Sequence, residues 1–280
     1  MKILIDFSWV YNKYYFVAST KVADEATLGS TLCNMLVQFF SRIAVTYGGS
    51  QVYAVLDSPT STLNNFQIFE GYKQNRDKEG KKKVYKLIQD VVLKLKDQVP
   101  EISFIKAKHY EADQVIAYIS NRAKGKVIIF SGDKDLLQLT AFKNVYVSNK
   151  FENGKFILLS DKEIFEKFKN SKGEDFTRIS TNKIDILKYR TLKGDTSDNL
   201  SPAFPRIQDK DIADIIKNYW IDNNELTEER VLVLVDEIRQ DNEKLAMKLL
   251  ENKDTWLRNY KIMNLVNIDE DIKIVKLEPR

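Results

Sequence analysis

The sequence predicts an α/β fold in which a mostly parallel, twisted sheet is flanked by helices. As far as residue 147, short apolar segments of strand length alternate with longer segments whose apolar residues recur at helical spacing. Acidic residues stand where several of these strands end. With 280 residues, 43% of them hydrophobic, the chain is long enough for one large domain or for one domain with an appendage.

The expected strands are short runs of apolar and β-branched residues. They are Lys2–Asp6, Gln51–Leu56, Ile102–Ala107, Val127–Phe130 and Val145–Val147, with a further candidate at Ile272–Leu277. Helices are expected between them, at Leu28–Tyr47, Val84–Leu95, Glu111–Lys124 and Asp135–Ala141. The first of these helices is stopped by a pair of glycines and the second by Pro100. This alternation of strands and helices indicates parallel pairing through crossover helices.

Beyond residue 161 the strand pattern fades and helical spacing dominates. The expected helices are Asp161–Phe168, Lys183–Leu192, Asp209–Trp220, Glu228–Arg239 and Glu243–Leu250. We therefore expect an α/β domain over residues 1–180 and a helical region over residues 181–280. A lysine-rich segment at about residues 59–100 has a different composition and is interpreted as an insertion in the first domain.

The acidic residues at the strand ends are the main functional signal. They are Asp6, Asp57, Glu111, Asp113, Asp133 and Asp135, followed by Asp195 and Asp198 in the run LKGDTSDN. The carboxyl ends of parallel strands share one edge of a sheet, so carboxylates from distant sequence would converge there. Uncompensated, they would raise one another's pKa, and hard cations such as Mg²⁺ relieve this repulsion. The pattern favours a metal-dependent site for phosphate chemistry.

Each acidic pair also has a simpler interpretation. Glu111 and Asp135 stand at the starts of helices, where acids cap the amino terminus. Asp195 and Asp198 are compatible with a solvated loop. Capping by Glu111 and Asp135 does not explain Asp113 and Asp133, the second acid two residues away in each pair. The combination of acids is more specific than any one of them.

The segment Tyr72-Lys73-Gln74-Asn75-Arg76 begins the positively charged part of the insertion, which continues through Lys81, Lys82 and Lys83. Above an acidic metal site, such a segment would contact phosphates, and the ring of Tyr72 would stack on a base. The alternative is a solvated helix face, which is the commoner fate of lysine runs.

Other chemistries have little support. There is one histidine, His109, and no nucleophile motif beside it, which argues against a histidine-based triad. Neither GxxxxGK[ST] nor GxGxxG occurs. One cysteine, Cys33, excludes an internal disulfide framework. We expect a cytoplasmic monomer without a signal peptide or a membrane-spanning segment.

The order of the motifs resembles the structure-specific 5′-nuclease (flap endonuclease) family, which has a PIN-like α/β domain. The motifs are two strands that end in aspartate, then YKxNR, EAD, SGDKDLLQL and GDxSDN. The stretches YEADQVIA and LKGDTSDNLSPAFPRI are most similar to the ribonuclease H branch found in T-even bacteriophages. The resemblance covers roughly residues 1–207.

The resemblance implies a metal-dependent 5′-to-3′ exonuclease or flap endonuclease. It would hydrolyse phosphodiester bonds at the 5′ ends of RNA primers or flaps on duplex DNA during phage replication. Two Mg²⁺ ions, replaceable by Mn²⁺, would be held by Asp6, Asp57, Glu111, Asp113, Asp133, Asp135, Asp195 and Asp198. The implied catalytic residues are Lys73, Arg76 and Asp133, and the implied nucleic-acid contacts are Tyr72, Lys73, Arg76, Lys81, Lys82, Lys83 and Lys193. The insertion would be a helical arch for the single-stranded 5′ end.

The implied partners are branched or nicked duplex DNA and RNA–DNA hybrids. A sliding clamp and a single-strand-binding protein are implied as well, although no motif for them is found. The compartment would be the host cytoplasm if the chain is phage-encoded.

Two positions depart from the family pattern. Gln114 stands where EADD is usual, which removes one negative charge from the second metal position. The run LSPAFPRI lacks the glycines of the usual duplex-gripping turn, a departure shared with the T-even branch. The alternatives are a catalytically impaired nucleic-acid-binding protein on the same fold and a PIN-like single-strand endoribonuclease.

Overall fold

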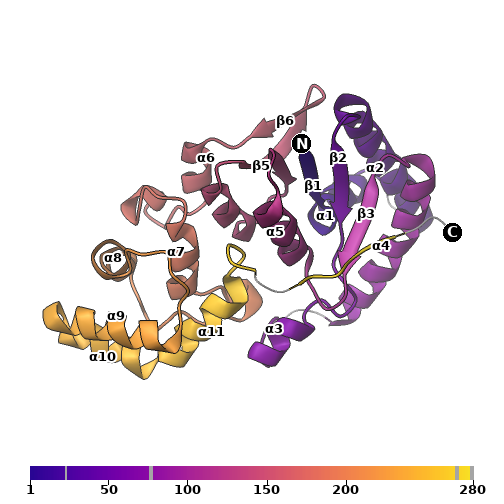
Figure 1. Cartoon of the computed structure of the whole chain (residues 1–280). Helices are drawn as coiled ribbons and strands as arrows, with labels where there is room; N and C mark the ends of the chain where they lie inside the picture. Colours follow the sequence, from indigo (N-terminus) through magenta and orange to yellow (C-terminus); the bar gives the residue numbers. More distant parts are fainter. Residues whose placement is uncertain (23, 76–77, 269–270, 278–280) are drawn as a thin grey trace.

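The computed structural model describes residues 1–22, 24–75, 78–268 and 271–277, without side chains at 25–26 and 78–87. In this part of the chain a seven-stranded sheet has the order β6-β5-β4-β1-β2-β3-β7 (Figure 1). The strands are β1 (Lys2–Asp6), β2 (Gln51–Val55), β3 (Ser103–Ala107), β4 (Val127–Phe130), β5 (Val145–Glu152), β6 (Lys155–Leu158) and β7 (Ile274–Lys276). The five inner strands are parallel and the two edge strands are antiparallel to their neighbours. The predicted fold class is therefore confirmed.

The register of the sheet determines where the acidic residues emerge. Asp6 of β1 lies opposite Val55 of β2, two residues before Asp57. On the other side of β1, Ile5 lies opposite Phe130, the last residue of β4. Because these strands are parallel, the segments that follow them leave the sheet at the same edge.

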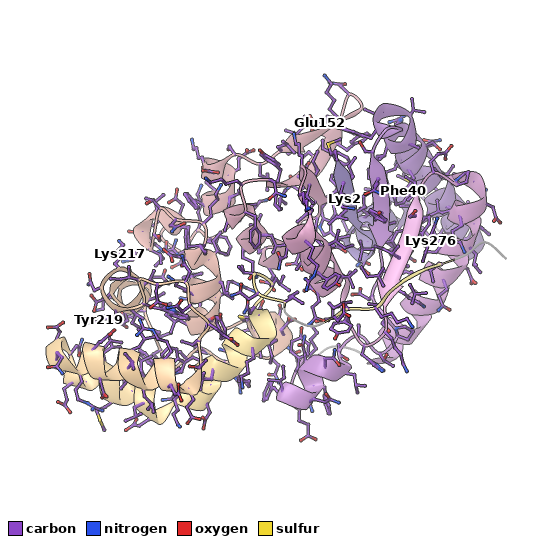
Figure 2. All side chains as sticks on the ribbon, viewed as in Figure 1. Lys2, Phe40, Glu152, Lys217, Tyr219 and Lys276 are labelled. Atoms are coloured by element: carbon purple, nitrogen blue, oxygen red, sulfur yellow. The ribbon has the colours of Figure 1, made fainter. Side chains whose placement is uncertain are left out.

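Both faces of the sheet are covered by helices, because successive residues of a strand point to opposite faces. Ile3 and Ile5 belong to a core with α1 (Phe7–Ser19), α2 (Glu25–Tyr47) and α4 (Lys78–Gln98). Leu4 belongs to the core on the other face, with α5 (Ala112–Arg122) and the 3-10 helix η1 (Asp135–Ala141). Phe40 of α2, labelled in Figure 2, is completely buried in the first core.

Helix α1 was not predicted. The sequence places its aromatic residues directly after a strand, and the helix begins at once because Asp6 caps it through the backbone N–H of Trp9. Of the aromatic residues of this helix, Tyr11 is buried in the core, whereas Phe16 is 70% exposed.

Helix α2 is a candidate membrane span by length and composition, since Thr27–Tyr47 has a mean hydropathy of 1.2. The expectation that no segment would qualify is wrong on that criterion. Leu32, Leu36 and Phe40 of this helix are fully buried against the sheet, so its apolar face has a partner inside the protein. A core helix passes the same test, which makes the finding weak evidence for a membrane.

The insertion contains α3 (Leu63–Ile68) and α4, which is longer than the predicted helix. The second half of α4 packs in the core that α2 shares, through Ile88, Val91, Val92 and Leu95, which recur at helical spacing. Strand β5 also continues beyond the prediction. It forms a hairpin with β6 through Asn153 and Gly154, which both have positive φ.

The C-terminal region is helical, as predicted. It contains α6 (Asp161–Glu166), the 3-10 turn η2 (Phe176–Arg178), α7 (Asp185–Lys193), the 3-10 turn η3 (Thr196–Asp198), α8 (Asp209–Asp214), the π-helical turn η4 (Ile215–Tyr219), α9 (Glu228–Asp241), α10 (Glu243–Glu251) and α11 (Lys253–Met263). The chain then returns to the sheet, and β7 pairs with β3 within the predicted final strand. The division at residue 180 stays a prediction.

Candidate metal site at the carboxyl edge of the sheet

Asp6 is the central carboxylate of the edge. It accepts hydrogen bonds from the N–H of Trp9 at 3.1 Å and from the hydroxyl of Ser131 at 2.7 Å. Burial raises the pKa of Asp6 to about 7, although the bond from Ser131 opposes the shift, and the charges of Asp57 and Asp133 raise it further. Three carboxylates from three strand ends therefore share one electrostatic environment.

Asp57 connects the edge to two helices. One oxygen accepts the hydroxyl of Ser8 in α1 at 2.6 Å, and the other accepts the N–H of Ala112, the first residue of α5, at 2.9 Å. The carboxylate thus holds the start of α5, which carries the next two acids, and this explains how residues 57 and 113 approach one another.

Glu111 is buried and heavily hydrogen-bonded. It accepts the hydroxyl of Tyr72 at 2.7 Å and the side-chain amide of Asn65 at 3.2 Å, and it forms an ion pair with Lys73. Burial and then the charge of Glu111 raise the pKa of Asp113 well above its ordinary value, while Lys73 opposes the shift.

Gln114 has a local structural role. Its side-chain oxygen accepts the N–H of Glu111 at 3.0 Å, as in a capping box at the start of α5. The residue that departs from the family pattern is therefore used to begin the helix that presents Asp113.

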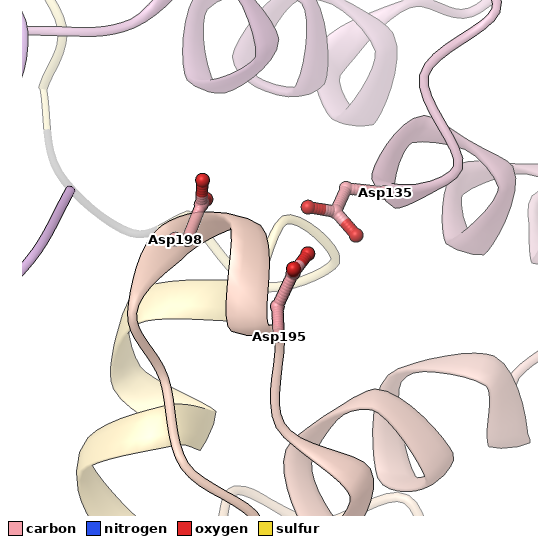
Figure 3. A group of neighbouring side chains, drawn as sticks. All are labelled: Asp135, Asp195 and Asp198. Carbon is pink, nitrogen blue, oxygen red and sulfur yellow. The ribbon is translucent and has the colours of Figure 1, made fainter. Parts of the chain in front are cut away.

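The second half of the site joins the two regions of the chain. Oxygens of Asp135, Asp195 and Asp198 lie within 4.8 Å of one another (Figure 3). Arg190 of α7 lies 2.5 Å from both Asp135 and Asp195. Burial raises the pKa of Asp135 to about 6 against the opposing charge of Arg190. Burial would also raise the pKa of Asp195, but Arg190 and a bond from Ser197 hold it below its ordinary value.

The turn that carries Asp195 and Asp198 depends on its flanking residues. Gly194 has φ of 72° and ψ of −176°, a region that is almost restricted to glycine. A Cβ there would lie 2.6 Å from the carbonyl oxygen of Leu200. Asn199 is left-handed, and the backbones of Asp195 and Leu200 form a bridge that closes the turn.

Residues 71–73 of the insertion are hydrogen-bonded to this turn. The N–H of Lys73 donates to the carbonyl of Asp198 at 3.1 Å, and the side chain of Asn199 donates to the carbonyl of Gly71 at 2.8 Å. The ammonium group of Lys73 lies 3.7 Å from the carboxylate of Asp198 as well as against Glu111. Burial alone would lower the pKa of Lys73, and the surrounding carboxylates raise it above its ordinary value.

The other predicted nucleic-acid contacts have different outcomes. Tyr72 is 6% exposed and its hydroxyl is bonded to Glu111, so the predicted stacking on a base does not fit its position. Lys193 is exposed and paired with Asp209 at 2.9 Å. Arg76 and the side chains of Lys81, Lys82 and Lys83 lie outside the described residues.

The eight predicted acids therefore gather at one edge. The charges of Asp57 and Asp133 raise the pKa of Asp6, and those of Glu111, Asp133 and Asp57 raise the pKa of Asp113. The charges of Asp133, Asp195 and Asp198 likewise raise the pKa of Asp135. Asp133 is exposed, and one of its oxygens accepts the N–H of Asp135 at 2.9 Å. A cleft is lined by Glu111, Asp113, Asp135 and Asp198 together with Tyr72, Leu200, Ile262 and Met263, among others. This all-oxygen donor set fits hard divalent cations.

Sequence reasoning missed four residues of the site. Ser8, Asn65 and Ser131 donate hydrogen bonds to its carboxylates, and Arg190 neutralises two of them. Of these residues, only Arg190 could have been predicted from the sequence, because it lies one helical turn before the acidic GDTSDN run.

A mostly parallel sheet whose carboxyl edge gathers acids, with Lys73 held against two of them, is an arrangement that suits a hard divalent cation. Residues 1–169 match the family model described as the 5′-3′ exonuclease N-terminal resolvase-like domain, and the chain belongs to this family. A comparison with curated proteins found no match.

Solved structures with the same fold come from bacteriophage T5. The D15 protein co-crystallised with metal ions has a TM-score of 0.63 at 16% identity, over 95% of this chain and 89% of that chain. The D15 flap endonuclease in complex with DNA and metal ions has a TM-score of 0.63 at 17% identity, over the same shares. The 5′-exonuclease with bound zinc has a TM-score of 0.62 at 16% identity, over 95% and 90%. The shared fold thus includes the C-terminal helices.

Proposed function

We propose that this protein is a metal-dependent 5′-nuclease. The observation that carries the proposal is the convergence of eight carboxylates from five segments on one edge, with the ammonium group of Lys73 held against two of them. Membership of the 5′-3′ exonuclease family and the shared fold of DNA-bound T5 flap endonuclease support it. The finer proposal is cleavage at the 5′ ends of flaps or RNA primers on duplex DNA, with Mg²⁺ as the cation and Mn²⁺ as a substitute.

Divalent cations bound at this edge would activate water and stabilise negative charge on the leaving oxygen. Asp6, Asp57, Glu111, Asp113 and Asp133 would hold one ion, and Asp135, Asp195 and Asp198 a second. Lys73 would orient the scissile phosphate and offset the charge that develops on its oxygens. The hydrogen bonds from Ser8, Ser131 and Asn65 fix the carboxylates before the substrate arrives.

The assay is cleavage of a labelled duplex that carries a 5′ flap or a 5′ RNA primer, with Mg²⁺ and with EDTA. We expect short products from the 5′ side that require the cation. Asp113→Asn and Asp133→Asn should abolish cleavage and leave binding within about threefold, because they remove ligands without removing cationic contacts. Asp236→Asn, an exposed acid of α9, is the matched control. Robust cleavage by Asp133→Asn would sink the assignment.

A binding protein without catalysis is the second candidate. Gln114 was the feature in its favour, but its amide oxygen caps α5. Calorimetric titration with Mg²⁺ or Mn²⁺ distinguishes the nuclease from the binding protein, because a protein that has lost its metal sites binds neither ion. A single-strand endoribonuclease would instead prefer unpaired RNA to the flap duplex.

We further propose the setting in which the enzyme works. The T-even ribonuclease H resemblance supports a role in phage replication, in the host cytoplasm, as a monomer. A sliding clamp and a single-strand-binding protein are the proposed partners, and pull-down with the purified proteins is the test.

A further inference from the structure

Arg258 of α11 is held in a defined position beside the acidic cleft. Its guanidinium lies over the ring of Phe69, 4.1 Å from the centroid. One of its nitrogens donates to the hydroxyl of Ser201 at 3.3 Å and to the side chain of Asn259 at 3.1 Å. An aromatic face and two hydrogen bonds therefore fix the plane of the group, which is the pre-organisation that arginine needs to bind an anion.

The charge of Arg258 has no carboxylate partner among the described residues. Three other arginines that are largely shielded from solvent each pair with an aspartate, namely Arg178, Arg190 and Arg230. Burial lowers the pKa of Arg258 and no carboxylate offsets it, yet a guanidinium stays protonated at neutral pH. A partly buried, uncompensated cation costs stability, and its presence needs an explanation.

The position of Arg258 supplies that explanation. Phe69 precedes Lys73 by four residues, and Ser201 follows Asp198 by three. The three residues from Asp198 to Ser201 span at most about 10 Å. About three nucleotides of a strand, at 3.4 Å each, cover the same length. Ile262, one helical turn beyond Arg258, lines the cleft together with Glu111. The segment from Lys73 back to Phe69 and the segment from Asp198 on to Ser201 thus both contact this arginine.

We propose that Arg258 binds a backbone phosphate of the nucleic-acid strand one to three nucleotides from the bond that is cleaved. The inference rests on the proposed function and adds a contact from the C-terminal helices, outside the residues that match the family model. The planar guanidinium suits bidentate contact with a phosphate, while Ser201 and Phe69 hold it in place. Lys73 would act at the scissile phosphate and Arg258 at a neighbouring one.

The test compares Arg258→Gln and Arg258→Met with wild type. Met keeps an apolar contact on Phe69 and removes the charge, so this variant should fold with an unchanged or higher Tm. Binding of a labelled 5′-flap duplex is measured by fluorescence anisotropy in EDTA across a series of salt concentrations. Both variants should bind about tenfold more weakly, and the slope of log K against log salt should fall by about 1.

Kinetics supply the second measurement. KM should rise about tenfold while kcat at saturating substrate stays within about twofold, because the contact is not made to the reacting phosphate. Arg239→Gln, which removes a paired arginine on α9, is the matched control and should change neither quantity.

Wild-type affinity and salt slope in a folded Arg258→Met variant would overturn the inference and leave Arg258 as packing between α3 and α11. Failure of the proposed function would give a different result, because wild type itself would then neither bind nor cleave the flap duplex. In that case the inference about Arg258 would fail as well.

Discussion

Asp6 illustrates how one buried carboxyl makes the stability of the protein depend on pH. Its pKa rises from an ordinary 3.8 to about 7 in the folded protein. Between these values the folded state holds a proton that the unfolded state has lost, so the contribution of Asp6 to stability falls as pH rises from about 4 to about 7.

We expect Asp6→Asn to remove this dependence. In EDTA, the unfolding free energy of the variant relative to wild type should increase from pH 4 to pH 7 and then level off. Urea unfolding at a series of pH values measures the difference. A difference that stays constant with pH would show that Asp6 titrates normally.

Lys73 carries a separate prediction at the residue scale. Its ammonium group is shared between Glu111 and Asp198 and is buried with them. Lys73→Ala should lower kcat about 100-fold or more, as removal of a charge-stabilising donor does, and weaken flap binding only a few-fold. Single-turnover rates and anisotropy measure the two effects. Lys183→Ala, which removes a lysine paired with Asp161, is the control. An unchanged turnover rate would exclude Lys73 from the reaction.

At the scale of elements, the turn between α7 and η3 places two acids against the sheet. Gly194 permits this turn, because its backbone conformation and the nearby Leu200 carbonyl leave no room for a Cβ. The hydrogen bonds from Lys73 and Asn199 then tie the start of the insertion to the same turn. The geometry of the acidic group formed by Asp135, Asp195 and Asp198 therefore depends on one glycine.

Gly194→Ala should destabilise the protein by about 2 kcal/mol or more and weaken Mn²⁺ binding, because Asp195 is displaced. Urea unfolding and calorimetric titration measure the two effects. Gly29→Ala is the control: Gly29 lies in α2 with open space around its Cβ position, and the change should raise stability by about 0.5–1 kcal/mol. Wild-type stability of Gly194→Ala would mean that the turn adapts without strain.

At the scale of the whole molecule, the acidic edge is where the sheet and the C-terminal helices meet. Asp135 comes from the sheet domain, while Asp195 and Arg190 belong to the segment that enters the helices. Met263, the last residue of α11, and Leu265 just beyond it are hydrogen-bonded to the side chain of Gln138 through their backbones. A cation bound by Asp135, Asp195 and Asp198 would therefore join the two parts of the chain.

A saturating divalent cation should accordingly raise the Tm of the whole protein in a single transition. At 100 times the Kd the gain is about 2.7 kcal/mol for one site. Scanning calorimetry with Mn²⁺, compared with NaCl at equal ionic strength, measures it. Asp236→Asn should keep the full shift and Asp195→Asn should lose most of it. A Tm that does not respond to Mn²⁺ would contradict a metal site.

The sequence by itself determined the inner strands, most helices and the eight acids. These features rest on short-range patterns: strand runs, helical spacing and acids placed directly after strands, which the parallel register then brings to one edge. Even the final strand, β7, followed from its apolar run. Helices α1, α3 and α11 and strand β6 were not predicted; α1, for example, follows β1 without an intervening turn that would mark its start.

Only the tertiary structure decided which side chain meets which acid. Tyr72 is buried against Glu111, 39 residues away, although its sequence context suggested an exposed ring. Arg190 reaches Asp135 across 55 residues. Within the described part of the chain, no carboxylate forms an ion pair with Arg258, which its place in the sequence does not reveal. Side-chain pairing depends on distances between elements that are remote in the chain, and periodicity carries no information about those distances.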